Sequence, residues 1–124
     1  MTGRIHYAAG PSAARANETV PKVDIGEGIL LQVIADGANL NAVHWNIPDG
    51  DVVPEHAHVQ EQFGYVIGGA LELTVSGQTY LVGAGDSYVI PPNAPHGFRA
   101  RGQTEAIDVF SPLRDLSTAG GRHR

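Results

Sequence analysis

The chain lacks cysteine altogether, which excludes disulfide bonds, thiolate nucleophiles and metal sites with sulfur ligands. It is also short of positive charge: 8 Lys and Arg face 13 Asp and Glu, and the basic residues are scattered along the sequence. Proteins that bind nucleic acid need a basic surface against its phosphates, so we expect no nucleic-acid partner. The longest apolar run, near GILLQVIA, is too short to span a bilayer, so we expect no membrane partner and a cytoplasmic location.

Turn-forming residues, by contrast, are abundant, with 16 glycines and 8 prolines among 124 residues. From Gly28 onward, short strand-like runs alternate with turn signals. In ALELTV (70–75), apolar and polar residues alternate as on a half-buried strand. The length suits a single domain. We therefore expect an all-β fold, an antiparallel barrel or jelly roll of about eight or more strands that can hold a ligand pocket.

The patterning divides the chain into three parts. Residues 1–27 are weakly patterned and are expected to form an N-terminal arm or an edge strand. Residues 28–112 carry the strand pattern and form the predicted barrel. The Gly-rich, charged residues 113–124 are expected to form a C-terminal tail.

Histidines concentrate in two short segments that could supply metal ligands. In HAHVQEQ, His56 and His58 would share one face of a regular strand with Gln62, while Glu61 would point away. A bulge after the histidines would reverse that choice. In PPNAPHGF, His96 follows a Pro-rich turn at the start of another strand. Three imidazoles and one amide or carboxylate oxygen suit a divalent Fe, Mn, Ni, Co, Cu or Zn ion with open positions, and not a closed structural zinc site.

A pair of histidines two residues apart is weak evidence by itself, since polar histidines are common at strand starts. The flanking residues strengthen it, because GDVVPEHAHVQEQFGYVIGG resembles the first motif of the cupin family, G-x5-H-x-H-x3-E-x6-G. Gly50, His56, His58 and Gly69 are in register with that motif, and Gln62 replaces the glutamate.

The second histidine segment resembles the second cupin motif, G-x5-P-x-G-x2-H-x3-N. In GDSYVIPPNAPHGFRA, Gly85, Pro91 and His96 match, Asn93 stands for the turn glycine and Ala100 replaces the final asparagine. The two motifs follow one another in the expected order, with one copy of each. The resemblance therefore implies a single-domain cupin, with the double-stranded β-helix (jelly-roll) fold, in a class that commonly forms homodimers.

The same resemblance implies one divalent transition metal per chain, bound by His56, His58, Gln62 and His96. Because glutamine is neutral, this ligand set leaves the full 2+ charge on the ion, which favours an anionic ligand and Lewis-acid chemistry. The glutamate form of the motif is common among cupin dioxygenases, so Gln62 favours a reaction other than oxygen activation.

The segment AIDVFSPLRDL holds a second group of candidate residues, Asp108, Phe110 and Arg114. An arginine can bind a carboxylate bidentately, an aromatic ring can stack on a sugar, and an aspartate can transfer a proton. On spacing alone, the favoured interpretation is that Phe110 is a core residue and that Asp108 and Arg114 form an ion pair at the rim.

The pattern D-x-F-x-x-x-R resembles the pectin-degradation cupins that linearise 4,5-unsaturated uronates. That resemblance implies catalytic roles for Asp108 and Arg114, substrate binding by Phe110 and Arg114, and a small anionic substrate. The resulting hypothesis is a metal-dependent lyase or isomerase of a small acidic sugar. A metal-dependent dioxygenase or cyclase of an aromatic or polyketide substrate, and a non-catalytic binding module, remain open. Trp45 is expected in the core or a dimer interface, and Tyr88 in either the pocket or the packing.

Overall fold

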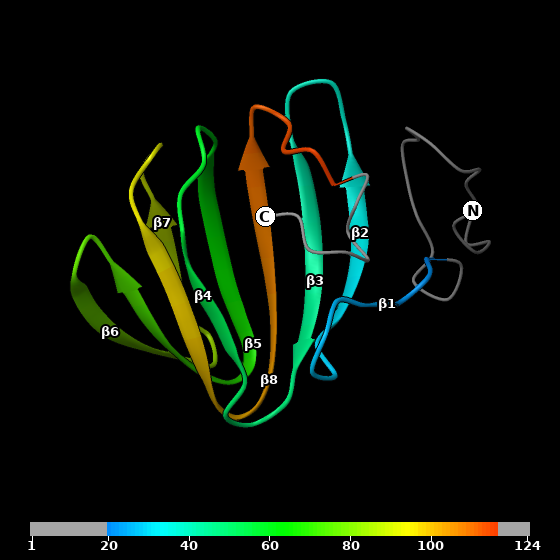
Figure 1. The fold of residues 1–124 in the computed structure, drawn as a ribbon. Helices are drawn as coiled ribbons and strands as arrows, with labels where there is room; N and C mark the ends of the chain where they lie inside the picture. The colour runs from blue at the N-terminus through cyan, green and yellow to red at the C-terminus, as the bar shows by residue number, and fades with distance from the viewer. Residues whose placement is uncertain (1–19, 117–124) are drawn as a thin grey trace.

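The computed structural model describes residues 20–116, and the regular elements of this part of the chain are all strands (Figure 1). The expectations for residues 1–19 and 117–124 lie outside the described residues. Within residues 20–116, no helix is long and apolar enough to cross a membrane. The strands are β1 (Val23–Asp24), β2 (Leu30–Asp36), β3 (Asn41–Ile47), β4 (Val52–His56), β5 (Glu61–Val75), β6 (Gln78–Gly83), β7 (Ser87–Ile90) and β8 (His96–Ser111).

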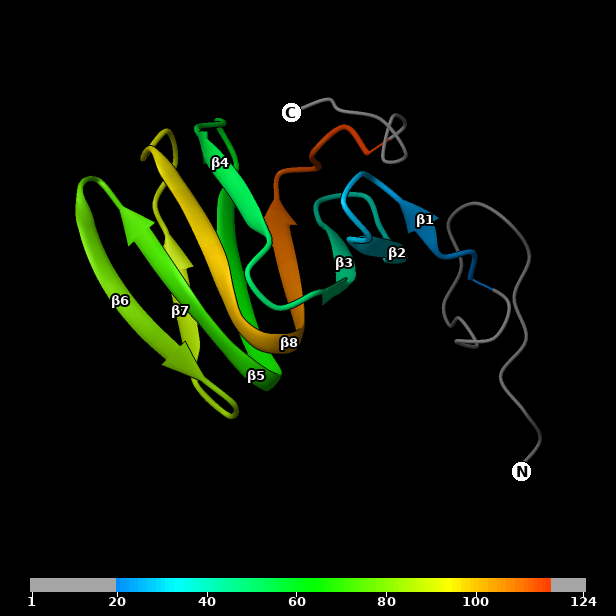
Figure 2. The same ribbon diagram turned by 60° about the horizontal axis from the view of Figure 1, so that its bottom comes forward.

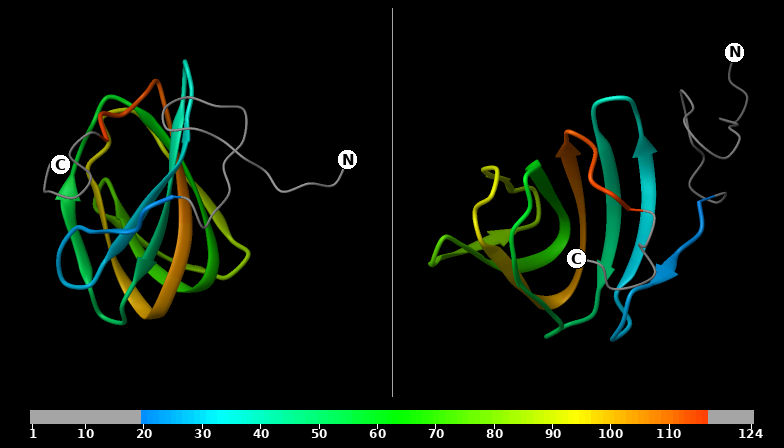
Figure 3. Two further views of the ribbon diagram at one scale, coloured as in Figure 1. Left: turned by 90° about the vertical axis from the view of Figure 1, so that its right-hand side faces the viewer. Right: turned by 45° about the horizontal axis from the view of Figure 1, so that its top comes forward.

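The strands form one antiparallel sheet in the order β1-β2-β3-β8-β5-β6, with β4 paired to β8 and β7 paired to β5. β8 pairs with β3, β4 and β5 and so runs through the middle of the structure. The sheet curves around a common interior (Figures 2 and 3). The all-β, single-domain jelly roll predicted from the sequence is therefore confirmed.

Two of the strands are longer than the sequence predicted. The segments EQFGYVIGG and ALELTVSG, and likewise HGFRAR and EAIDVFSP, predict two short strands in each region, whereas the structure has the single strands β5 and β8. Register shifts fall beside Gly68 in the pairing of β5 with β8. Gly69 and Gly102 both have a left-handed backbone, with φ of 77° and 80°. The glycines thus mark bends inside continuous strands, which allow each strand to serve both halves of the barrel.

The hydrophobic core fills the inside of the curved sheet. At the start of β5, residues alternate between exposed and buried, so that Gln62, Gly64 and Val66 point inward. The hairpin that joins β5 to β6 turns at Ser76 and Gly77, both with the positive φ that is typical of a tight hairpin turn. The buried core residues are Ile29, Leu31, Val43, Trp45, Ile47, Val66, Leu71, Leu73, Val82, Ile90, Phe98, Ala100 and Phe110.

Candidate metal centre

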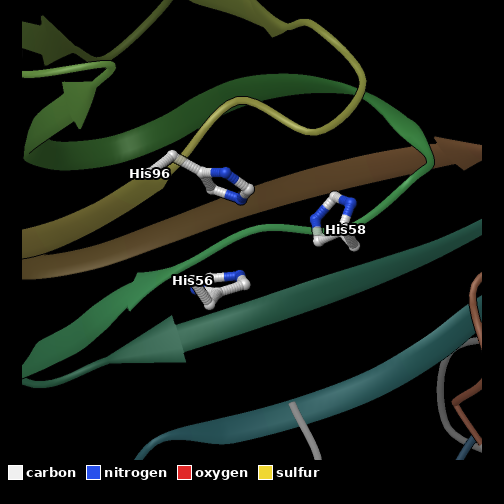
Figure 4. A group of neighbouring side chains, drawn as sticks. All are labelled: His56, His58 and His96. Atoms are coloured by element: carbon white, nitrogen blue, oxygen red, sulfur yellow. The ribbon is translucent and has the colours of Figure 1, made fainter.

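Three histidines from separate parts of the fold surround one space (Figure 4). His56 ends β4, His58 lies in the loop that follows, and His96 begins β8. One ring nitrogen from each lies within 4.8 Å of the corresponding atoms of the other two. Within residues 20–116, this arrangement could hold a metal ion, as the two sequence motifs predicted.

Backbone carbonyls fix how the three rings are protonated. Each Nδ1 atom lies at hydrogen-bonding distance from a carbonyl oxygen two residues away, at 2.9 Å (His56 to Pro54), 3.1 Å (His58 to Gln60) and 2.8 Å (His96 to Ala94). A carbonyl only accepts hydrogen bonds, so each Nδ1 donates its proton, and in a neutral ring the Nε2 lone pair is free. Metal-binding histidines are typically oriented in this way.

The free nitrogens support the metal assignment. The Nε2 atom of His96 is buried and has no hydrogen-bond partner. The Nε2 atom of His58 lies 3.0 Å from Oε1 of Gln62, so in the neutral form two lone pairs face each other. Unpaired buried polar atoms are unfavourable, and a bound cation would satisfy these atoms together. The residues present therefore fit a divalent metal ion.

Burial also keeps the rings neutral. It lowers the pKa of His56 to about 4, and the charges of neighbouring imidazoles and Arg114 add to that effect. Burial likewise lowers the pKa of His58 and of His96 below the usual range. At neutral pH, all three rings are therefore in the form that binds metal.

Gln62 faces the histidines, but not for the reason that a regular strand suggested. β4 ends at His56, the chain turns, and β5 begins only at Glu61. Sheet pairing instead sets the direction of Gln62, because it lies opposite Ile90 and Phe110, both fully buried. Gln62 is 3% exposed, whereas Glu61 is exposed to solvent.

The turn before His96 explains the departure from the second motif. Asn93, which stands where the motif has glycine, has a left-handed backbone with φ of 66°. Asparagine tolerates this conformation better than most residues. The backbone N–H of Asn93 donates to the carbonyl of His58 at 2.8 Å. This bond ties the loop that carries His58 to the turn that leads to His96.

Asp108 is fully buried next to this site and accepts hydrogen bonds from several strands. The indole N–H of Trp45 donates to Oδ2 and the hydroxyl of Tyr88 donates to Oδ1, each at 2.7 Å. Burial raises the pKa of Asp108, and the hydrogen bonds from Tyr88, Gln62 and Trp45 oppose that rise. The sequence did not predict that Trp45 and Tyr88 donate hydrogen bonds to Asp108.

Arg114 lies over the ring of Phe110, with Cζ 5.1 Å from the ring centroid. Phe110 also contacts His58 edge-on, at 5.6 Å between ring centroids. The buried side chain of Asn41 holds the backbone of Arg114 on both sides: Oδ1 accepts from the N–H at 3.1 Å, and Nδ2 donates to the carbonyl at 2.7 Å. Phe110 and Arg114, which the resemblance implied as substrate-binding residues, thus lie beside the histidines. The sequence did not predict that Asn41 holds the backbone of Arg114.

Comparison with known proteins agrees with this geometry. Residues 43–110 match the model of the cupin domain family. The chain is a cupin. It is 28% identical over 100 residues to the pectin degradation protein KdgF of Dickeya dadantii (strain 3937), covering 79% of the cupin and 91% of that protein. The solved structure of KdgF from a Halomonas species superposes with a TM-score of 0.80 at 31% identity, covering 86% of the cupin and 98% of that chain.

The cupin is also similar to a protein that is named for polyketide synthesis. The polyketide synthase CurC of Streptomyces cyaneus is 38% identical over 74 residues. The match covers 57% of the cupin and 48% of CurC, so the cupin spans about half of that protein.

The cupin has a cavity of about 810 Å³ beside the histidines. His56, Gln62, Phe110 and Arg114 line it, whereas Asp108 is not among its lining residues. Most of the other lining residues are aliphatic or aromatic. Among the described residues that line the cavity, Arg114 is the one with a permanent positive charge. Three carboxylates, Glu27, Asp51 and Glu55, also line the cavity, so among the described lining residues Arg114 alone offers an anionic ligand a permanent positive charge, next to the candidate metal ligands His56 and Gln62.

Proposed function

We propose that this cupin is a metal-dependent isomerase or lyase that opens the ring of a small unsaturated acidic sugar of the 4,5-unsaturated uronate type. The observation that carries the proposal is that His56, Gln62 and Arg114 line one cavity, while His58 and His96 bring their ring nitrogens to His56. The similarity to KdgF, a protein of pectin degradation, supports it.

In this proposal, Nε2 of His56, His58 and His96 and Oε1 of Gln62 would hold one divalent transition metal. All four ligands are neutral, so the ion would keep its charge and would supply a Lewis acid that stabilises negative charge on a substrate oxygen. Ions from Mn to Zn accept such a nitrogen and oxygen set, so the identity of the metal follows from availability.

Arg114 would bind the substrate carboxylate through two parallel hydrogen bonds. The guanidinium lies over the face of the Phe110 ring, and the cation–π contact favours that position. Asn41 holds the backbone at the same point. Since the Phe110 side chain is 1% exposed, its predicted stacking on the sugar is a smaller contribution than its support of Arg114.

The reaction is an isomerisation, so it needs no added water or redox partner. Removal of the anomeric hydroxyl proton lets a carbonyl form at that carbon while its bond to the ring oxygen breaks. The electron pair passes through the ring oxygen and C5 to C4, which takes up a proton and leaves a ketone at C5. The resemblance to the uronate-linearising cupins implies that Asp108 transfers the proton. In this structure Asp108 contacts the cavity through Gln62, so proton transfer by Asp108 is a prediction that turnover of Asp108→Asn tests.

The first experiment follows loss of the double-bond absorbance of unsaturated galacturonate monomer with metal-loaded protein, against an enzyme-free blank. We expect acceleration that a chelator abolishes. Arg114→Gln should raise KM by roughly 10- to 100-fold, the value of a hydrogen bond to a charged group. Arg101→Gln is the matched control, because Arg101 is exposed and pairs with Glu72. No acceleration from protein that carries metal would refute the uronate proposal.

One observation favours a second candidate, a cyclase of an aromatic or polyketide substrate. The cavity walls include Trp45, Phe98 and several aliphatic residues, which suit a flat apolar body better than a ring covered with hydroxyl groups. The similarity to CurC supports this candidate. Binding of aromatic carboxylates to the metal-loaded protein, without turnover of the uronate, would favour it.

We also propose that the cupin forms a homodimer. Phe63, Tyr65 and Ile67 are about two-fifths exposed on the outer face of β5, with Val89 of β7 beside Phe63. Contiguous exposed apolar side chains often mark an interface. Light scattering coupled to size exclusion gives the mass, and a monomer at micromolar concentration would refute the dimer.

A further inference from the structure

We propose that Asp108 is a positioning residue: held by Tyr88 and Trp45, its carboxylate fixes the side-chain amide of Gln62 so that Oε1 faces the histidines. The inference rests on the metal site of the proposed function and goes beyond it. It assigns the orientation of the Gln62 ligand to Asp108, Tyr88 and Trp45, none of which is itself a candidate metal ligand.

The two ends of the Gln62 side-chain amide have opposite hydrogen-bonding roles. One end, Nε2, only donates hydrogen bonds, and the other, Oε1, only accepts them. Trp45 and Tyr88 donate to the two oxygens of Asp108, so its carboxyl group acts as an acceptor on both, and its hydrogen bond with Gln62 uses Nε2. The remaining end, Oε1, lies 3.0 Å from Nε2 of His58. A reversed amide would turn an NH2 group, which has no lone pair to give, toward the metal.

Each of the two carboxylate oxygens of Asp108 accepts a hydrogen bond from another strand. Tyr88 on β7 donates to Oδ1 and Trp45 on β3 donates to Oδ2, at 2.7 Å each. An indole N–H can only donate, so Trp45 requires an acceptor at this position. The carboxylate is thereby fixed from two sides of the barrel, and it presents a fixed acceptor to Gln62.

Tyr88 reaches Asp108 by crossing β5 at a glycine. Gly64 of β5 lies opposite Tyr88 on one side and Asp108 on the other. A Cβ atom on Gly64 would lie 2.0 Å from Cζ and 2.3 Å from the hydroxyl oxygen of Tyr88. The absence of a side chain at residue 64 therefore gives the tyrosine its path to Asp108, which shows that the contact depends on several strands at once.

The test measures Co²⁺ affinity by calorimetry and the visible spectrum of the bound Co²⁺, neither of which requires turnover. Tyr88→Phe keeps the carboxylate charge and removes only the hydrogen bond to Asp108. We expect it to lower Co²⁺ affinity by about 10-fold, within the range for residues that orient a metal ligand. Tyr80→Phe, an exposed tyrosine on β6, is the matched control and should bind as the wild type does.

A donor–acceptor exchange provides the second arm. Asp108→Asn alone should weaken Co²⁺ binding by about 10- to 100-fold, because an asparagine no longer fixes which end of the Gln62 amide faces it. In a Gln62→Glu background the pair is matched again, with asparagine as donor and glutamate as acceptor. Because the glutamate by itself strengthens cation binding, Gln62→Glu alone is the reference, and Asp108→Asn should weaken Co²⁺ binding by less in that background than in the wild type.

The outcomes separate the two proposals. A wild type that binds no Co²⁺ would overturn the metal site, and the inference with it. A wild type that binds Co²⁺ while Tyr88→Phe binds equally tightly, with the same spectrum, would overturn the inference alone. Asp108→Asn that keeps Co²⁺ but loses turnover would instead assign Asp108 to proton transfer. The indole N–H resonance of Trp45, the single tryptophan, reports in each variant whether the site is still folded.

Discussion

Replacing Gly69 by alanine tests why the first motif ends in glycine. Gly69 lies at the bend of β5 with φ of 77°, a conformation that costs an L-residue roughly 1–2 kcal/mol. An added Cβ would also lie 2.4 Å from the carbonyl oxygen of Gln103 and 2.8 Å from Cα of Thr104. Both contacts are with backbone atoms, which cannot rotate away as a flexible side chain can.

The neighbouring contacts limit how far the structure can adjust. Thr104 is fully buried, and its hydroxyl, with one proton to donate, lies within hydrogen-bonding distance of the carbonyls of Ala70 and Gly102, at 3.0 and 2.9 Å. Moving Thr104 away from residue 69 would disturb these bonds. Overpacking of this kind typically costs about 1–3 kcal/mol. Together with the backbone strain, Gly69→Ala should lower the free energy of unfolding by about 2–5 kcal/mol.

Gly68→Ala is the matched control, since a Cβ there meets nothing within 4 Å and the backbone is not left-handed. Urea titration followed by Trp45 fluorescence gives both free energies of unfolding. We expect Gly68→Ala to stay within about 1 kcal/mol of the wild type, the usual range of a compatible Gly→Ala change. If Gly69→Ala were as stable as Gly68→Ala, the account of this bend would be wrong.

Two further predictions concern the site. In the metal-free protein, His56 takes up its proton near pH 4 when folded and near 6.5 when unfolded. The unfolded chain thus binds more protons between these values, and the free energy of unfolding should fall as pH falls through that range. Urea titrations at several pH values measure this, and a His56→Gln variant with an equally steep decline would contradict it. Asn41→Ala should raise KM for the anionic substrate more than Gln60→Ala does, because Asn41 holds the Arg114 backbone on both sides whereas Gln60 makes one bond, to Leu113. Equal KM values would show that Asn41 does not position Arg114.

The parts of the fold that the sequence predicted well are those where one residue type is required by local backbone geometry. Gly50, Gly69 and Gly85 of the two motifs all have positive φ, at 84°, 77° and 87°. Asn93 is left-handed as well. Motif spacing therefore encodes turns and bends, and these bring the histidine segments together.

Strand continuity was harder to predict, because a glycine that bends a strand looks the same in sequence as a glycine that ends one. Gly68 and Gly69 suggested that one strand ends there and another begins, yet β5 continues through them to Val75. The direction of Gln62 was predicted correctly from an assumption that failed: the strand is interrupted after His56, and non-local pairing with β7 and β8 turns Gln62 inward.

The contacts around Asp108 show which sequence signal could have revealed more. Tyr88 and Trp45 reach Asp108 only because β3, β7 and β8 are brought together by pairings between distant parts of the chain. No local pattern specifies those pairings. Gly64, however, occupies an inward position in the middle of a strand, where glycine weakens the sheet unless another group approaches closely. Such a glycine indicates that a bulky side chain crosses the strand there, and the crossing group, Tyr88, leads directly to the carboxylate beside the candidate metal ligands.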